Sequence, residues 1–419
     1  MSTNTIQKEN SRNHLFSPLS QSKDFRFLWL GQLFSLLGSS ITTIILPVIV
    51  YSLTHSTLAM GTLMAVNMLP NVLILFFSGL IVDKFHRVKI MMVVDLIRFF
   101  LLLAVTALAL THHLTMGSLY LMMAAFGLMD GLFQPAYSAV RAKVFKPEIR
   151  NSANALNQVT VQGVRLIGPS IGGLLITGLS AVFGFGFDSL TFLISFATLY
   201  CLRGITFKKQ EVSDIQTTSS FKRDFLEGFL VVKENQWLLV TILAFSIINI
   251  STSGILGVLI PWFVNVHFGF PPYVYGLLIS ASGVGALISA LIYGSRTTWR
   301  YRAYIAYGGI FFEAIALLLM TLTSSVFLLI VLMFCSGFGM MLFGLVWEIS
   351  LQELVPEEKF GRVVSLDLLG SFALLPLGYL LTGFLAEVIG SIHTMIALSI
   401  TTMVIVAVVM MIPGVRQYD

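Results

Sequence analysis

Long apolar stretches separated by short polar gaps repeat along the whole chain. About twelve of them reach roughly 20 residues, the length that an α-helix needs to cross the hydrocarbon core of a membrane. The sequence therefore predicts an all-α membrane protein with twelve transmembrane helices. The expected spans are residues 27–52, 57–82, 90–111, 116–140, 152–178, 181–202, 237–266, 273–293, 303–322, 325–350, 363–386 and 391–413.

The basic residues occupy alternate gaps between these stretches. Apart from Arg98 and Arg165, all 25 Lys and Arg residues precede the first stretch, follow the last one or lie in every second gap. Membrane helices retain positive charge on the cytoplasmic side. We therefore expect a multi-pass protein of the cell membrane with both termini in the cytoplasm. The net charge of +5 then marks orientation and not nucleic-acid binding.

Composition agrees with a chain embedded in lipid, since 56% of its residues are hydrophobic and only 11% are charged, against roughly 25% charged in soluble domains. Cys201 and Cys335 lie inside expected spans, so we expect no disulfide, no metal site and no cofactor. External pH sensing by histidines is a weaker alternative to ordinary polar helix ends. The histidines at expected external ends are His55, His112, His113, His267 and His393.

The spans divide into two sets of six. We predict a cytoplasmic tail at 1–26, a six-helix bundle at 27–202, a central cytoplasmic loop at 203–236, a second six-helix bundle at 237–413 and a cytoplasmic tail at 414–419. Within the loop, Phe221, Phe225 and Phe229 recur at helical spacing, which fits either a short amphipathic surface helix or a solvated connector.

The two sets also repeat one another in sequence. Gly173-Leu-Leu-Ile-Thr-Gly178 in the fifth span matches Gly378-Tyr-Leu-Leu-Thr-Gly383 in the eleventh. Each span follows a Pro-Glu pair, at Pro147 and Pro356. Two pseudo-symmetric bundles around a cavity at the membrane midplane are the layout of a secondary transporter.

The gap after the second span reads Gly79-Leu-Ile-Val-Asp83-Lys84-Phe-His86-Arg87-Val-Lys89. It resembles the G-x-x-x-D-[RK]-x-x-R-x-[KR] signature of the major facilitator superfamily, with His86 where relatives often carry Gly. The resemblance implies a cytoplasmic gate in which Asp83 pairs with Arg141, with orientation alone as the alternative. Gly79 would allow close backbone approach, and the cations would hold the loop at the anionic membrane face.

The fifth span contains Gly163, Gly168, Pro169, Gly172 and Gly173, a run similar to the G-P-x-x-G-G motif of the antiporter branches. The resemblance implies export. The glycines and the proline of the motif would serve either plain helix packing or closure of the cavity. Further short runs resemble the macrolide-efflux and enterobactin-exporter branch. They are Leu30-Gly31-Gln32, Ser35-Leu-Leu-Gly38, Pro135-Ala136 and Asn154-Ala-Leu-Asn-Gln158. Many members of that branch carry an acid where this chain has Ser39, so no proton-binding carboxylate is expected there.

Ionisable residues inside the spans are the functional candidates, because each costs roughly 2.5–3.5 kcal/mol to insert unless it faces a partner or water. Asp130, between Gly127 and Gly131, is the first candidate for a proton site, with Arg165 as its expected partner and a structural ion pair as the alternative.

Three further sets of acids lie in the spans. Asp95 and Arg98 are three residues apart on one helix and should pair. Glu313 has no intrahelical cation nearby, so it is the second candidate for proton exchange. A conformational change that alters the solvation of such a carboxyl group changes its affinity for a proton. Three acids nearer helix ends rank lower: Asp188, Glu348 and Asp367.

These features favour a secondary active transporter that exports amphipathic organic molecules, such as a drug, an antibiotic or a siderophore, in exchange for H⁺. The alternative is an uptake symporter or facilitator for a small polar nutrient, whose cavity would need more polar groups. An enzyme is not expected, because the chain contains no His-Glu-x-x-His and no phosphate-binding loop. The expected partners are the solute, H⁺ and the bilayer.

Overall fold

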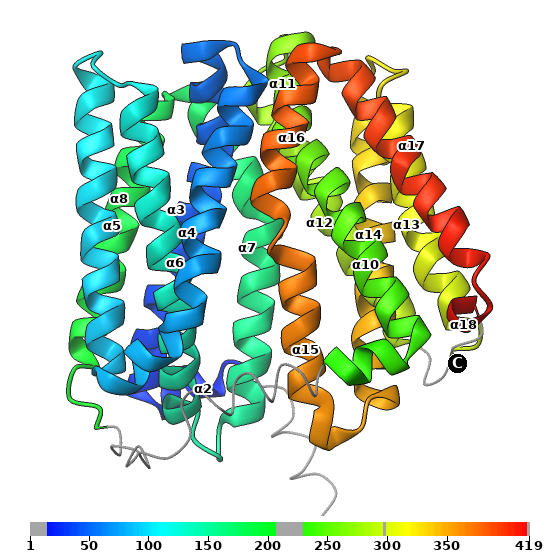
Figure 1. Ribbon diagram of the computed structural model, residues 1–419. Helices are drawn as coiled ribbons and strands as arrows, with labels where there is room; N and C mark the ends of the chain where they lie inside the picture. The colour runs from blue at the N-terminus through cyan, green and yellow to red at the C-terminus, as the bar shows by residue number, and fades with distance from the viewer. Residues whose placement is uncertain (1–14, 207–228, 296–298, 417–419) are drawn as a thin grey trace, which may run out of the picture. The chain divides into compact units, whose positions relative to one another are not determined.

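The computed structural model describes residues 15–206, 229–295 and 299–416, in which helices joined by short connections make up the fold and no strand occurs (Figure 1). Twelve helical stretches within these ranges are long and apolar enough to cross a membrane, which confirms the predicted fold class. The first six spans are α3 (Lys23–Thr54), α4 (Thr57–Lys84), α5 (Arg87–Leu110), α6 (Met116–Val144), α7 (Arg150–Gly178) and α8 (Ala181–Cys201), preceded by α2 (Ser17–Gln21).

Two of the remaining spans are interrupted. The seventh runs through α10 (Gln236–Gly254), the π-helix η1 (Ile255–Leu259), α11 (Ile260–Trp262) and the π-helix η2 (Phe263–His267). The eleventh is divided into α15 (Glu357–Phe372) and α16 (Leu375–Val388). Pro261 and Pro376 lie in these spans, and proline cannot donate the backbone hydrogen bond that a continuous helix needs.

The other helices of the second half are uninterrupted. They are α12 (Pro272–Gly294), α13 (Arg302–Met320), α14 (Val326–Leu354), α17 (Ser391–Met410) and the short α18 (Pro413–Arg416). The predicted surface helix around Phe221 and Phe225 and most of the central loop lie outside the described residues.

Packing divides the chain into two compact units. Unit 1 consists of residues 1–46 and 69–210, and unit 2 of residues 47–68 and 211–419. The second unit therefore includes the end of α3 and the start of α4, which the sequence assigns to the first six-helix bundle. Residues of this segment make several polar contacts within unit 2.

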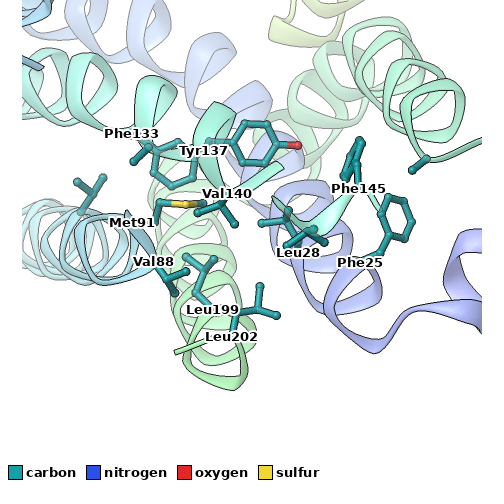
Figure 2. Close-up of a cluster of buried hydrophobic side chains, with 14 of the residues drawn as sticks. Phe25, Leu28, Val88, Met91, Phe133, Tyr137, Val140, Phe145, Leu199 and Leu202 are labelled. Atoms are coloured by element: carbon teal, nitrogen blue, oxygen red, sulfur yellow. The ribbon is translucent and has the colours of Figure 1, made fainter. Parts of the chain in front are cut away.

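The core of unit 1 lies where α3, α5, α6 and α8 meet near the basic gaps, and Figure 2 shows its side chains. Phe25 of α3 packs against Phe145, with ring centroids 5.3 Å apart. Tyr137 of α6 donates a hydrogen bond from its hydroxyl to Asn157 Oδ1 of α7 at 2.9 Å. The other buried members labelled in the figure are Leu28, Val88, Met91, Phe133, Val140, Leu199 and Leu202.

Aromatic rings dominate the corresponding core of unit 2. Phe245 of α10 stacks on Phe343 of α14 with centroids 3.9 Å apart, and Tyr307 of α13 contacts the same ring edge-on. The buried Tyr307 hydroxyl shares a 2.7 Å hydrogen bond with Thr241. Each unit thus has its own apolar core, and hydrogen bonds such as Tyr137–Asn157 and Thr241–Tyr307 join buried polar groups of neighbouring helices.

Candidate functional site

One buried cation, Arg98 of α5, lies between two carboxylates in unit 1. Its Nη2 is 2.5 Å from Asp130 Oδ1 of α6, and its Nη1 is 3.8 Å from Asp95 Oδ1 on its own helix. The two acids differ in environment, since the Asp130 side chain is 43% exposed whereas that of Asp95 is fully buried. Arg98 is only 5% exposed, so these carboxylates supply the countercharge that a buried guanidinium needs.

Aromatic faces enclose the same guanidinium. Its central carbon lies 5.7 Å from the ring centroid of Phe126, 5.2 Å from that of Phe133 and 5.3 Å from that of Phe192, within cation–π range. Phe126, Asp130 and Phe133 follow one another at spacings of four and three residues, so they share one face of α6. That face presents to Arg98 one anionic group and two aromatic rings.

A hydrogen bond from the neighbouring helix fixes the inner carboxylate. Ser195 of α8 donates from its hydroxyl to Asp95 Oδ2 at 2.6 Å. Together, α5, α6 and α8 place one cation, two acids and a hydroxyl in a single cluster, which we call the Arg98 cluster and define as Asp95, Arg98, Asp130 and Ser195.

The expected partner of Asp130 was Arg165, and the structure corrects this prediction. Arg165 is exposed on α7 and forms no ion pair with any residue that the structure describes, whereas Asp130 is bonded to Arg98. The expected pair of Asp95 with Arg98 is present but shares its cation. The Arg98 side chain is long enough to extend from α5 to α6, and it lies closer to Asp130 there than to Asp95 on its own helix.

Asp188 of α8 is more deeply buried than its place in the sequence predicts. Its position eight residues into the helix predicted access to water, but the residue is fully buried. Its carboxylate accepts hydrogen bonds from the hydroxyls of Thr42 and Thr191, the latter at 3.1 Å. Gly38 of α3 permits this arrangement, since a Cβ there would lie 2.1 Å from both Asp188 Oδ1 and Thr191 Oγ1.

Glu313 of α13 is the buried acid of unit 2, with 1% of its surface exposed. Ser336 of α14 lies 3.5 Å from Oε1, and Oε2 has no hydrogen-bond partner among the described atoms. A close crossing lies one turn away, where a Cβ on Gly309 would be 2.6 Å from the Gly339 carbonyl oxygen. Glu313 thus lies in a tightly packed region and forms no ion pair with a described residue.

The fifth-span motif packs α7 against α3. A Cβ on Gly168 would lie 2.2 Å from Ser40 Oγ, and one on Gly172 would lie 3.0 Å from the Cα of Ile41. Pro169 and Gly173 are buried beside them. Gly163 differs, because a Cβ there would meet no described atom within 4 Å. Two of the motif's four glycines therefore make a close helix crossing, the role of small residues in membrane helices.

The motif after the second span lies at the short turn between α4 and α5. His86 is the N-cap residue of α5 and has an extended backbone conformation. Its Nε2 lies 3.0 Å from the carbonyl oxygen of Ile205. Arg141 lies near the rings of Tyr137 and Phe145. The pairing of Arg141 with Asp83 stays a prediction, since the Asp83 side chain lies outside the described residues.

The other members of this motif differ in how far they are exposed. Lys84 and Lys89 are exposed, and Arg87 is half-buried. Gly79 is exposed too, with no described atom within 4 Å of a Cβ placed there. The close backbone approach expected at Gly79 is therefore wrong for this structure.

The histidines expected at the external ends lie at the end of the spans that carries no Lys or Arg. We call this end the non-basic end. It is defined by the connections at 55–56, 111–115, 179–180, 268–271, 321–325 and 389–390. In unit 2, His55 and His393 line one cavity of about 420 Å³ together with Trp262 and Glu387. Among the described residues, no three His, Cys, Asp or Glu side chains are placed to hold a metal ion.

The chain has twelve spans, two units that share a sequence motif, and ionisable side chains inside the spans. These features define a polytopic transporter of the major facilitator type. The comparison with protein families gives the same answer. Residues 13–419 match the model described as transmembrane secretion effector, and the chain belongs to this family of the major facilitator superfamily.

Curated relatives cover nearly all of the chain at low identity. The multidrug efflux pump Tap of Mycolicibacterium fortuitum is 23% identical, with 91% of this chain and 94% of the relative aligned. Macrolide efflux protein A of Streptococcus pyogenes is 25% identical over 94% and 97% of the two chains. The staphyloferrin A transporter of Staphylococcus aureus is 22% identical over 89% and 92%.

Solved structures agree on the fold. A bacterial homologue of the iron transporter ferroportin, in an inward-facing state, has a TM-score of 0.70 at 17% identity over 92% of this chain and 98% of that one. The nucleoside transporter NupG has a TM-score of 0.73 at 12% identity with the same coverage. At these identities the likeness shows the fold alone, because one fold can carry many different functions.

Proposed function

We propose that this protein exports amphipathic organic molecules in exchange for protons, by alternating access, with the Arg98 cluster as the coupling site. The observation that carries the proposal is the charge balance of the cluster, in which one guanidinium serves both Asp95 and Asp130. Two ionised carboxylates beside one guanidinium carry a net negative charge. Because uncompensated charge is costly inside a membrane, the cluster has a physical reason to bind a proton.

Asp130 is the acid best placed to exchange that proton. Its side chain is 43% exposed, whereas Asp95 is fully buried and receives the Ser195 hydrogen bond. A proton on Asp130 would replace a charge-assisted contact with a weaker one, and Arg98 would then pair more closely with Asp95. The guanidinium thus has two alternative partners, which is the kind of two-state contact that a transport cycle requires.

Export is supported by two further observations. The glycine–proline motif of α7, which resembles that of the antiporter branches, forms the close crossing with α3. Two of the relatives above are named as efflux proteins, for macrolides and for multiple drugs. The chain's abundant Phe and Met residues, 34 and 18 in number, are suited to lining a cavity for large apolar solutes. In the proposed orientation both termini are cytoplasmic and the non-basic end is external.

The test compares the accumulation of fluorescent amphipathic dyes in cells with and without the protein. Expressing cells should retain less dye, and a proton uncoupler should abolish the difference. Asp130→Asn keeps the shape of the side chain but cannot carry a proton, so it should lose uncoupler-sensitive export while purified protein still binds the dye. Glu348→Gln, at an exposed acid of α14, is the matched control and should export normally.

Two outcomes would contradict the proposal. Full export driven by a pH gradient in Asp130→Asn would remove Asp130 from the mechanism and direct attention to Glu313, the second candidate for proton exchange. Greater dye accumulation in expressing cells would favour the uptake alternative over export.

A further inference from the structure

The non-basic end of the spans carries a single acidic residue. Among the 20 Asp and Glu residues of the sequence, only Glu387 lies within three residues of a connection at this end, and no Lys or Arg does. Acids contribute little to membrane orientation, so orientation does not explain its presence. Glu387 is near the end of α16, and its contacts give it a different role.

Its carboxylate reaches the start of α4, within unit 2. Glu387 Oε1 accepts a hydrogen bond from the backbone N–H of Leu58 at 3.3 Å and another from the hydroxyl of Ser56. Ser56 in turn caps α4 locally, since its Oγ accepts from the N–H of Ala59 at 3.0 Å. A carboxylate thus lies at the positive end of a 28-residue helix, where negative charge is stabilised.

Below this contact, the two backbones approach closely. A Cβ on Gly61 would lie 2.3 Å from the carbonyl oxygen of Tyr379, and one on Gly383 would lie 2.8 Å from that of Thr57. The Thr57 hydroxyl donates to the Gly383 carbonyl at 3.2 Å. The crossing consists mainly of backbone and small-residue contacts, with Glu387 providing a charged contact at its end.

A second polar contact joins the end of α3 to the interrupted seventh span. The Tyr51 hydroxyl donates to the carbonyl oxygen of Val258 at 2.6 Å, within η1. Single-turn π-helical segments occur often at functional sites. The connection between α3 and α4 comprises just His55 and Ser56, with His55 in the left-handed region at φ 54°. The two contacts therefore lie on helices that are joined by a two-residue turn.

We propose that Glu387 is the latch of the non-basic end: by capping α4 from α16, it holds the α3–α4 connection on unit 2, and its release is a step of the transport cycle. The cavity beside it, lined by His55, Trp262 and His393, leaves room for the carboxylate to swing away from the helix. The release step in the transport cycle rests on the proposed function, whereas the contact of Glu387 with α4 does not.

The test reads the burial of Thr57, which is 4% exposed and lies directly under the latch. In protein with Cys201 and Cys335 replaced by serine, Thr57→Cys is introduced as reporter, and the rate of its reaction with a charged maleimide is measured in nanodiscs. Both faces are accessible there, so the result depends on neither orientation nor transport. Glu387→Ala should accelerate labelling about two- to five-fold, the range for an exposed charge at a helix terminus.

Two further variants make the test specific. Glu387→Gln keeps an acceptor oxygen and loses the charge, so its labelling rate should lie between those of the parent and Glu387→Ala. Glu353→Gln removes another exposed acid of unit 2, whose ion pair with Arg302 at 2.6 Å lies at the opposite end, and should leave the rate unchanged. An unchanged rate in Glu387→Ala, or equal acceleration in Glu353→Gln, overturns the latch. Neither result would bear on proton coupling at Asp130.

Discussion

Asp95 and Asp130 illustrate how two carboxylates beside one arginine acquire different roles. Asp95 is fully buried and hydrogen-bonded by Ser195, so it is held in one position. Asp130 has the shorter contact with Arg98 and is also the more exposed of the two. Arg98 itself is enclosed by protein, which makes it the member whose loss leaves the most uncompensated charge.

We therefore predict that Arg98→Ala destabilises the protein more than Asp130→Asn does. Removing one partner of a buried ion pair costs about 3 kcal/mol, because the remaining charge stays buried. Asp130→Asn leaves Arg98 with Asp95, so its cost should be smaller. The measurement is the unfolding free energy of the purified variants in mixed micelles.

Arg302→Ala serves as the control for the loss of an arginine. Arg302 pairs with Glu353 at 2.6 Å, nearly the distance of the Arg98–Asp130 contact, but in a more exposed setting of 17% and 53%. Its ion pair should contribute less than about 1 kcal/mol. Equal losses in Arg98→Ala and Arg302→Ala would show that burial of the cluster does not govern its energetics.

At the scale of helices, the close crossings are made at glycines that lie on facing surfaces. Gly168 and Gly172 of α7 bring it against α3 in unit 1. Gly378 of α16 does the same in unit 2, where a Cβ would lie 3.1 Å from the Cα of Ile250 on α10. The fifth span of each half therefore packs on the first, which gives the sequence repeat a structural counterpart.

These crossings predict opposite effects of substitution within one motif. Gly172→Val would force its side chain into the α3 backbone and should destabilise the protein by about 1–3 kcal/mol. Gly163→Ala adds a methyl group where no described atom lies within 4 Å, so it should be neutral or slightly stabilising through helix propensity. The melting temperatures of the two purified variants test these expectations. A large fall in the melting temperature of Gly163→Ala would contradict the conclusion that Gly163 lies outside the close helix crossing.

At the scale of the whole molecule, the alternation of basic and non-basic connections determines how the chain would lie in a membrane. The connections at 85–86, 145–149 and 295–301 are flanked by Lys or Arg, whereas those of the non-basic end are not. Such an arrangement favours one orientation of all twelve spans.

Labelling of single cysteines in intact cells tests this orientation. Thr111 and Ser324 are exposed at the non-basic end, and Ala142 and Ser295 are exposed at the basic end. In a background without Cys201 and Cys335, Thr111→Cys and Ser324→Cys should react with an impermeant maleimide from outside, while Ala142→Cys and Ser295→Cys should react only after the cells are opened. Labelling of either of the latter two in intact cells would contradict cytoplasmic termini.

The sequence by itself determined the number and order of the spans, because a membrane imposes a fixed length of apolar helix on each crossing. It also identified the glycine motifs and the acids inside the spans, since both deviate from the apolar background. Tertiary structure decided which of these groups meet. Arg98 pairs with Asp130 because α5 and α6 pack side by side, whereas nothing in the spacing distinguished Arg98 from Arg165 as its partner.

The same reason applies to Asp188 and Glu387. Position along a helix gives depth in the membrane but not which neighbour covers the side chain, so the burial of Asp188 by α3 could not be read from its place in α8. The contact of Glu387 with the first turn of α4 joins residues separated by 329 positions, which no local pattern encodes. Local pattern fixes where a helix begins and ends, and packing fixes which charges share a site.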